Sequence, residues 1–130
     1  MGRLETVEIL AHGPLTTVQD LGRFGFGRYG VAPSGALDSF SLRIGNLLVG
    51  NREGEASLEI TLFGFKLKAL TDVGIAITGA DMRPGLNGSP LKMWRSHILE
   101  KGDILFFRGV KTGCRTYLAM RVGIGVTSVL

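Results

Sequence analysis

Short apolar runs alternate with polar residues along most of the chain, and glycines separate the runs. Residues 5–10 place Val7 and Ile9 on one face and polar side chains on the other, and residues 57–64 repeat this period with Leu58 and Ile60. A period of two is typical of strands buried on one face. Further strands are expected at 15–19, 65–70, 73–79, 91–99, 104–107 and 116–122. Of these, 73–79 is apolar throughout, which predicts burial on both faces.

One segment, residues 37–49, has helical spacing instead. Its large apolar residues fall on one face of the helix: Phe40, Ile44, Leu47 and Leu48. Asp38 or Ser39 could cap its start, and Gly50 stands where a left-handed residue ends a helix. Gly45, inside the helix, favours a close backbone approach. One helix among roughly eight strands predicts a mainly β fold, a closed or nearly closed β-barrel with the helix at one end.

The composition is that of one globular segment, covering residues 1–130, with 45% hydrophobic and 20% charged residues. The single cysteine, Cys114, excludes an internal disulfide framework and a cysteine-based zinc cluster, and His12 and His97 lack metal-ligand spacing. No apolar run approaches the ~20 residues that cross a membrane. The acidic residues near the start do not fit a signal peptide. We therefore expect a cytoplasmic protein that does not associate with membranes.

The chain is basic, with a net charge of +4 from ten arginines and five lysines against eleven acidic residues. These basic residues are scattered, whereas nucleic-acid-binding proteins usually gather them on one helix or stripe. Nucleic acid is therefore not an expected partner. The preference for arginine favours recognition of a carboxylate or a phosphate, because the guanidinium group binds such anions through two parallel hydrogen bonds.

The segment 20–36 is rich in glycine and contains the letters G-x-G-x-x-G at 25–30. A dinucleotide site needs a strand before this motif and a helix starting within it, and neither is predicted here. Glycines beside Arg23, Arg28 and Tyr29 could form an anion-binding loop, since glycine lets backbone N–H groups approach a ligand. A tight loop with arginines on the surface explains the same residues equally well.

Three further polar residues could belong to a site. Ser34 and Asp38 precede the helix, where they could cap it, or where Ser34 could help the helix N-terminus to bind an anion. Asp81 follows the apolar strand 73–79 and is either a site residue or a turn residue. Asp38 and Asp81 would form a carboxylate pair only if the fold brought them together. Asn87, followed by glycine, is a strong turn signal.

Several segments, taken together and in order, resemble one known family. They are GPLTTVQDLGRFGFGRYGVAPSGALDSFSLRIGNLLVGN (13–51), LEITLFG (58–64), ITGADMRPGLNGSPL (77–91), KGDILFF (101–107) and RTYLAM (115–120). This is the family of KipA-like proteins, also called the 5-oxoprolinase C-subunit, allophanate hydrolase subunit 2 or the biotin-dependent carboxyltransferase A/B domain. The resemblance implies a cyclophilin-like β-barrel. It also implies a KipI-like partner and, with a third subunit, ATP-dependent opening of 5-oxoproline to glutamate.

The resemblance and the loop chemistry together give a set of expected site residues. Those expected to bind substrate or another anion are Arg23, Arg28, Tyr29, Ser34 and Asn87, and the candidates for catalysis are Asp38 and Asp81. ATP would act through the complex. A non-catalytic module that antagonises a KipI-like kinase inhibitor is a second interpretation. A carboxyltransferase component of a urea carboxylase is a third, and its biotin would come from another chain because no Met-Lys-Met attachment site is present.

The sequence also departs from the family pattern. Met120-Arg121-Val122-Gly123-Ile124 stands where members usually have Val-Ala-Gly-Gly-Ile. Family chains are more than twice as long, so we expect this chain to be the truncated N-terminal part of a KipA-like domain, inactive on its own. An unpaired sheet edge would favour association with other chains, including homo-oligomers.

Overall fold

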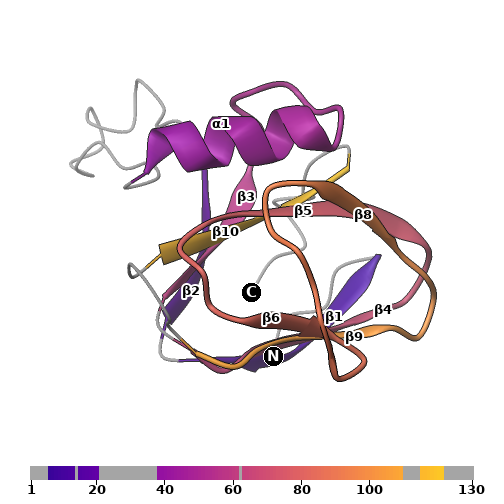
Figure 1. Cartoon of the computed structure of the whole chain (residues 1–130). Coiled ribbons are helices and arrows are strands. Elements are labelled where there is room, and N and C mark those ends of the chain that lie inside the picture. Colours follow the sequence, from indigo (N-terminus) through magenta and orange to yellow (C-terminus); the bar gives the residue numbers. More distant parts are fainter. Residues whose placement is uncertain (1–5, 14, 21–37, 62, 110–114, 122–130) are drawn as a thin grey trace, which may run out of the picture.

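A computed structural model describes residues 6–13, 15–20, 38–61, 63–109 and 115–121. They form one helix and ten strands (Figure 1). In chain order these are β1 (Val7–His12), β2 (Leu15–Gln19), α1 (Ser39–Leu48), β3 (Ser57–Thr61), β4 (Phe65–Ala69), β5 (Val73–Gly79), β6 (Pro84–Leu86), β7 (Ser89–Pro90), β8 (Ser96–Leu99), β9 (Ile104–Phe107) and β10 (Arg115–Met120).

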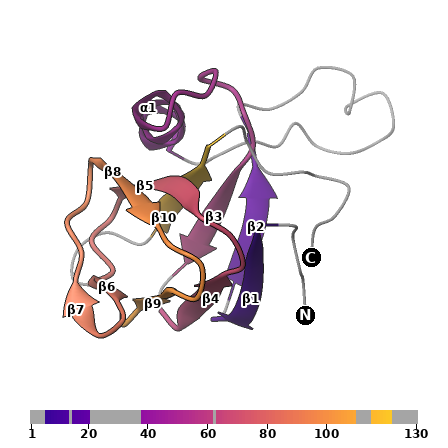
Figure 2. The ribbon, with the colours of Figure 1, turned by 90° about the vertical axis from the view of Figure 1, so that its right-hand side faces the viewer.

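The strands form two five-stranded sheets, in which every pair of neighbours is antiparallel. The first sheet has the order β1-β4-β9-β6-β7, and the second has the order β2-β3-β10-β5-β8. Figure 2 shows the two sheets face to face, with α1 on the outer side of the second. The expected mainly β, barrel-like fold with one main helix is confirmed.

The principal core lies between the two sheets. Val7 and Ile9 of β1 are buried in it, while Lys66 and Lys68 of β4 alternate outward. Its fully buried side chains include Leu58, Ile60, Phe65, Leu67, Ile75, Ile77, Leu105, Phe107 and Leu118. The rings of Phe65 and Phe107 pack with their centroids 5.5 Å apart. The period of two in the sequence therefore identified the face of each strand that builds this core.

The helix packs on the outer face of the second sheet with a side that is mostly small and polar but includes one large apolar residue, Leu42. Its buried residues are Ser41, Leu42, Gly45 and Asn46. A Cβ added to Gly45 would lie 3.2 Å from Thr78 Oγ1 and 3.4 Å from Ala119 Cβ, so this glycine does allow a close approach. The apolar face expected from the periodicity is divided: Phe40 and Leu47 are exposed, whereas Leu48 packs against the small buried cluster that contains Ala76 and Ala119 of the sheet. Polar and small residues on the sheet, described below, explain why this small and polar side of α1 is the one that fits.

Most predicted boundaries agree with the structure, and one does not. The strand expected at 91–99 is formed only as β8, because Trp94 has a left-handed backbone (φ 61°) and donates its N–H to Ile77 O at 2.7 Å. Gly50 (φ 82°) ends the helix as predicted, and Asn87 and Gly88 form the predicted turn with φ angles of 50° and 88°.

Candidate functional site

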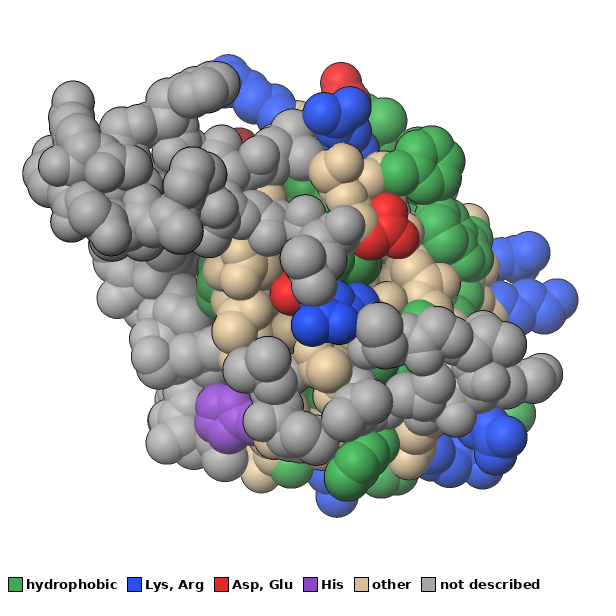
Figure 3. Space-filling model, turned by 90° about the vertical axis from the view of Figure 1, so that its left-hand side faces the viewer, with side chains coloured by type: hydrophobic (Ala, Val, Ile, Leu, Met, Phe, Trp, Pro, Cys, Tyr) green, Lys and Arg blue, Asp and Glu red, His purple; other side chains and the backbone are tan. Residues whose placement is uncertain are grey.

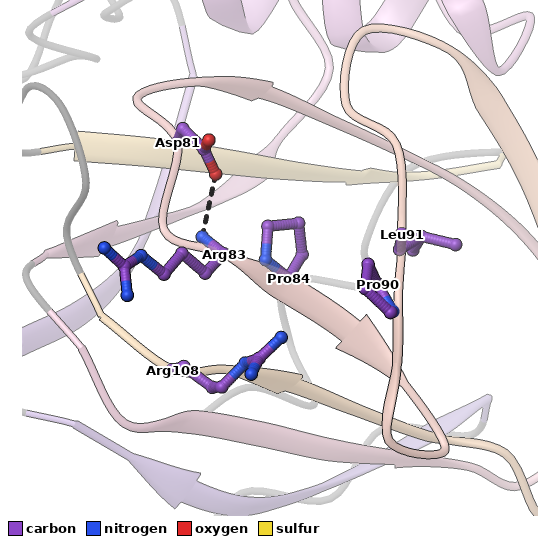
Figure 4. Close-up of a pocket in the computed structure, with 6 residues that line it drawn as sticks. All are labelled: Asp81, Arg83, Pro84, Pro90, Leu91 and Arg108. Carbon is purple, nitrogen blue, oxygen red and sulfur yellow. Dashed lines mark hydrogen bonds between the residues drawn. The ribbon is translucent and has the colours of Figure 1, made fainter.

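A pocket of about 360 Å³ opens where the ends of β5 and β9 meet the start of β6 (Figure 4). Two arginines and one carboxylate supply its charge, and prolines and a leucine supply its apolar wall. The lining residues are Asp81, Arg83, Pro84, Pro90, Leu91 and Arg108. Small-molecule sites are typically concave, with an apolar wall and a few convergent polar groups, and this pocket has that composition.

The backbone at the end of β5 sets the position of Asp81. Gly79 has φ 88°, and a Cβ there would lie 2.6 Å from Arg115 O, so the tight turn requires glycine. Two residues later, Asp81 Oδ1 accepts a hydrogen bond from the N–H of Arg83 at 2.8 Å. This contact closes a local turn of the kind that aspartate favours. The carboxylate is therefore held in the lining of the pocket, with its second oxygen not used in that bond.

The backbones of Arg83 and Arg108 are adjacent because β6 and β9 pair. Pro84 lies opposite Phe107 in the ladder, and the N–H of Arg108 donates to Arg83 O at 3.5 Å. Arg83 directly precedes β6 and Arg108 directly follows β9. Figure 4 shows their side chains pointing in opposite directions, with the Arg108 guanidinium on the side of Pro84 and Pro90. Both side chains are exposed. One carboxylate and two guanidinium groups leave a net positive charge, which favours an anionic ligand.

A second cavity of about 240 Å³ shares Arg108 with this pocket. Its other lining residues are Gly85, Gly88, Ile104 and Phe106, which are apolar or lack a side chain. Arg108 thus lines both the charged pocket and the apolar cavity.

A separate polar cluster lies between α1 and the second sheet. Thr17, Glu59, Tyr117 and Thr78 are directly opposite one another on four neighbouring strands. Tyr117 Oη donates to Glu59 Oε2 at 2.6 Å and accepts from the N–H of Asp38 at 2.9 Å. Both Tyr117 and Glu59 are buried. Burial, reinforced by the hydrogen bond to Glu59, raises the pKa of Tyr117 above its ordinary value.

The same cluster fixes the start of the helix. Asp38 is the N-cap: its Oδ1 accepts from the N–H of Ser41 at 3.0 Å, and its Oδ2 accepts from Ser41 Oγ. Thr78 Oγ1 donates to Ser41 O at 2.7 Å, which ties the helix to β5. Glu59 Oε1 lies 3.7 Å from Arg115 Nε. Of the caps that the sequence allowed, Asp38 is the one used, and its carboxylate is engaged in capping.

Asn87, expected to bind substrate, is placed in the turn between β6 and β7. Its Nδ2 donates to Asp103 Oδ1 at 2.9 Å, and its Oδ1 accepts from the N–H of Ile104 at 2.8 Å. The hydrogen bond from Asn87, together with one from the N–H of Glu100, holds the pKa of Asp103 below its ordinary value. These contacts join the turn to the start of β9.

The structure thus separates the expected site residues. Asp81 lines the larger pocket, whereas Asp38 and Asn87 are not among its lining residues. The pair formed by Asp38 and Asp81 is therefore not seen at this pocket. Four other expected residues lie outside the described residues: Arg23, Arg28, Tyr29 and Ser34.

Sequence reasoning missed Arg83 and Arg108, which the strand pairing brings together. A signal for Arg83 was present, since it stands two residues after Asp81, which follows a buried strand.

Among the described residues, no group of three or more His, Cys, Asp or Glu side chains could hold a metal ion. In the same part of the chain, no helix is long and apolar enough to cross a membrane. Figure 3 shows acidic and basic side chains together near the middle of the face it presents.

The fold and the pocket define a β-barrel-like domain with a site suited to a small anion. A family model for the carboxyltransferase domain, subdomain A and B, matches residues 29–130. The chain therefore belongs to the family of carboxyltransferase domains of the A and B subdomain type.

Curated relatives agree with this family. The chain is 40% identical over 124 residues to the urea amidolyase of Lachancea kluyveri, an alignment that covers 95% of this chain and 7% of that protein. It is 40% identical over 125 residues to the 5-oxoprolinase C-subunit of Escherichia coli, covering 95% of this chain and 40% of that protein. The chain thus spans two fifths or less of the length of these relatives.

Solved structures show the same fold. The urea amidolyase of K. lactis superposes with a TM-score of 0.85 at 43% sequence identity, over 91% of this chain and 7% of that one. The expected resemblance to the 5-oxoprolinase C-subunit and to carboxyltransferase A/B domains is confirmed.

Proposed function

We propose that this chain binds substrate within one subunit of an ATP-dependent 5-oxoprolinase, acting with a KipI-like protein and a third subunit. The observation that carries the proposal is the pocket lined by Asp81, Arg83 and Arg108, with the Arg108 guanidinium on the side of its proline wall. Its support from comparison is the 40% identity to the 5-oxoprolinase C-subunit. A cytoplasmic location belongs to this proposal, since the reaction consumes ATP.

The substrate fits the chemistry of the pocket. 5-Oxoproline is a five-membered lactam that carries one carboxylate. The Arg108 guanidinium can bind that carboxylate through two hydrogen bonds, and the rings of Pro84 and Pro90 provide a flat apolar wall for the lactam. A volume of about 360 Å³ is within the range of small-molecule sites.

Asp81 has the position of a general base in this proposal. Ring opening adds the oxygen of water to the lactam carbonyl carbon, breaks the C–N bond and leaves a proton on the nitrogen, which gives glutamate. The carboxylate oxygen of Asp81 that is not bonded to Arg83 can take the proton from water and return it to the nitrogen. Hydrolysis of ATP to ADP and phosphate, which consumes a second water, would supply the driving force. The pocket is sized for a small acid rather than a nucleotide, so we assign ATP binding to the other subunits.

The test is glutamate release from 5-oxoproline and ATP, measured with the KipI-like subunit and the third subunit present. Arg108→Gln is expected to raise KM for 5-oxoproline by roughly 100-fold, because a charge-assisted pair is lost. Asp81→Asn is expected to lower kcat by roughly 100-fold, the usual loss of a general base. Arg52→Gln is the matched control, since Arg52 is exposed in the loop after α1 and lines neither pocket described above.

Two results would contradict the proposal. Unchanged kcat and KM in both Arg108→Gln and Asp81→Asn would show that the pocket takes no part in the reaction. A stable complex of all the subunits that releases no glutamate would favour the alternative, a non-catalytic module that antagonises a KipI-like kinase inhibitor.

A second candidate function is the carboxyltransferase step of a urea carboxylase. It is favoured by the 43% identity to the solved urea amidolyase of K. lactis. The sequence has no Met-Lys-Met site, so biotin would be carried by another chain. Adding avidin to the complete complex separates the two functions: it should abolish urea carboxylation and leave 5-oxoproline hydrolysis unchanged.

A further inference from the structure

The outward face of α1 carries large apolar side chains that nothing in the described part of the chain covers. Phe40 is 64% exposed and Leu47 is 53% exposed. Trp94, in the loop before β8, is 43% exposed, and Ile98 on β8 is 72% exposed. We refer to these four residues as the α1 patch. An apolar cluster of this kind is a recognised mark of an interaction site.

The fold prevents α1 from turning this face inward. Gly45 lies against Thr78 and Ala119 at distances that leave no room for a larger side chain. On the same inward side, Asn46 donates through Nδ2 to the carbonyl oxygens of Glu53 and Glu55 at 3.1 and 2.8 Å. A rotation would break these contacts and bury Phe40 against polar groups of the sheet. The exposure of the patch is therefore a built feature of the fold.

The patch is continuous across two elements. The rings of Phe40 and Trp94 lie with their centroids 6.4 Å apart. Trp94 is fixed in this position by the hydrogen bond from its N–H to Ile77 O. Ile98 extends the patch along β8, which is the edge strand of the second sheet. A helix face beside an edge strand gives a partner both side chains to bury and backbone groups to pair with.

Most charges beside the patch are basic, although the exposed carboxylate of Asp38, which caps α1, lies next to it. Arg43 lies on α1 between Phe40 and Leu47, and Lys92 and Arg95 flank Trp94; all three are exposed. Residues 39–48 and 92–98, all of them described, contain no acidic side chain. Figure 3 shows hydrophobic side chains along one edge of the molecule, with both basic and acidic side chains next to them. A second copy docked here would bring like charges together, whereas an acidic rim would be attracted.

We propose that the α1 patch docks a partner subunit whose contact surface is apolar at its centre and acidic at its rim. In the complex proposed above, on which this inference rests, the KipI-like subunit is that partner. Phe40 and Trp94 are its expected anchors, because large aromatic side chains usually carry most of the binding energy of an interface. Arg43 and Arg95 would speed and orient the encounter.

The test measures the affinity of the purified chain for the purified KipI-like subunit by calorimetry. Phe40→Ser combined with Leu47→Ser should raise Kd by at least about 30-fold, as loss of central apolar anchors does. Arg43→Glu should also raise Kd, and the increase should be larger at low salt than at high salt, because salt screens the charge attraction that this variant removes. Leu10→Ser is the matched control, since Leu10 is 39% exposed on β1 in the other sheet. All the variants replace exposed residues, so circular dichroism should show unchanged folding.

Each outcome decides a different point. Binding by the unchanged chain with no loss in the patch variants would overturn the α1 patch as the surface and leave the proposed complex intact. No binding by the unchanged chain would overturn the KipI-like partner, and with it the partner named in the proposed function. A patch variant that only converts a dimer to a monomer would show that a second copy occupies the patch, and would also overturn the proposal.

Discussion

The two faces of the second sheet are built by opposite rules. The inner face meets the first sheet through large apolar side chains, such as Ile60, Ile77 and Leu118, all fully buried. The outer face meets α1 through Glu59, Tyr117 and Thr78, joined by directed hydrogen bonds. Burial of apolar area is strong but has little direction, whereas hydrogen bonds contribute less net free energy and fix geometry. This domain therefore gains its stability on one face of the sheet and places its helix on the other.

This division of roles also explains the exposed patch. Polar contacts, the close glycine and buried apolar residues such as Leu42 and Leu48 hold the helix without Phe40 and Leu47. Phe40 and Leu47 are then free to face a partner. The contacts between α1 and the second sheet therefore hold a binding surface in position, and the core between the two sheets stabilises the sheet that carries α1.

The largest expected effect is in the inner layer. Phe65→Ala should lower the free energy of unfolding by about 3–5 kcal/mol, because it removes a fully buried ring that packs on Phe107 and leaves a cavity. Leu47→Ala, on the outward face of α1, should change it by less than about 0.5 kcal/mol. Urea unfolding of both variants checks the contrast. Equal losses would mean that the outer surface is as important to stability as the core.

The next effect concerns the outer layer and depends on pH. Tyr117→Phe should cost about 1–3 kcal/mol near neutral pH, because buried Glu59 loses the hydrogen bond from Tyr117 and the N–H of Asp38 loses its acceptor. The folded protein raises the pKa of Tyr117 above 10.0, so the unfolded chain releases this proton first as the pH rises. Stability from Tyr117 is thus complete below pH 10 and is lost above it.

Urea unfolding at a series of pH values from 8 to 11 tests the sign. The stability difference between the unchanged chain and Tyr117→Phe should shrink above pH 10. Glu59→Gln is the companion variant: it keeps an oxygen that accepts from Tyr117 and removes the carboxylate charge that opposes the phenolate. It should therefore show a smaller alkaline loss than the unchanged chain. Parallel curves for all three proteins would refute the buried Tyr117–Glu59 pair.

The inner layer was largely predictable from the sequence, and the outer layer was not. Alternation around Val7, Ile9 and Leu58 is local, so strands and their core faces follow from it. By the same logic Glu59 is a solvent-facing residue, and its burial depends on Tyr117, which lies 58 residues away in the chain. Periodicity showed that Phe40 and Leu47 share a helix face, but it does not state what that face meets.

The candidate pocket divides in the same way. Asp81 was identified because a polar residue after a buried strand is a local signal. Arg108 entered the pocket through the pairing of β6 with β9, and register between distant strands leaves no pattern in either segment. Asn87 was a turn signal first, and its hydrogen bonds to Asp103 and Ile104 agree with that role.

The smallest expected effect lies at the margin of the first sheet, outside both layers, and concerns Asn87. Asn87→Ala should lower the free energy of unfolding by about 1 kcal/mol, because alanine tolerates the left-handed backbone (φ 50°) less well than asparagine does. Asn87→Gly relieves that strain and loses the same side-chain contacts. The difference in unfolding free energy between the two variants therefore measures the backbone strain alone.

The hydrogen bond from Asn87 to Asp103 also makes the stability depend on pH. The pKa of Asp103 is lowered from 3.8, so its contribution is present above that pH and is lost as the pH falls further. The advantage of the unchanged chain over Asn87→Gly should therefore decrease in acid, as measured by thermal unfolding between pH 6 and pH 2. If both variants keep full stability at every pH but raise KM for 5-oxoproline, Asn87 belongs to the substrate site, and the pocket extends to the margin of the first sheet.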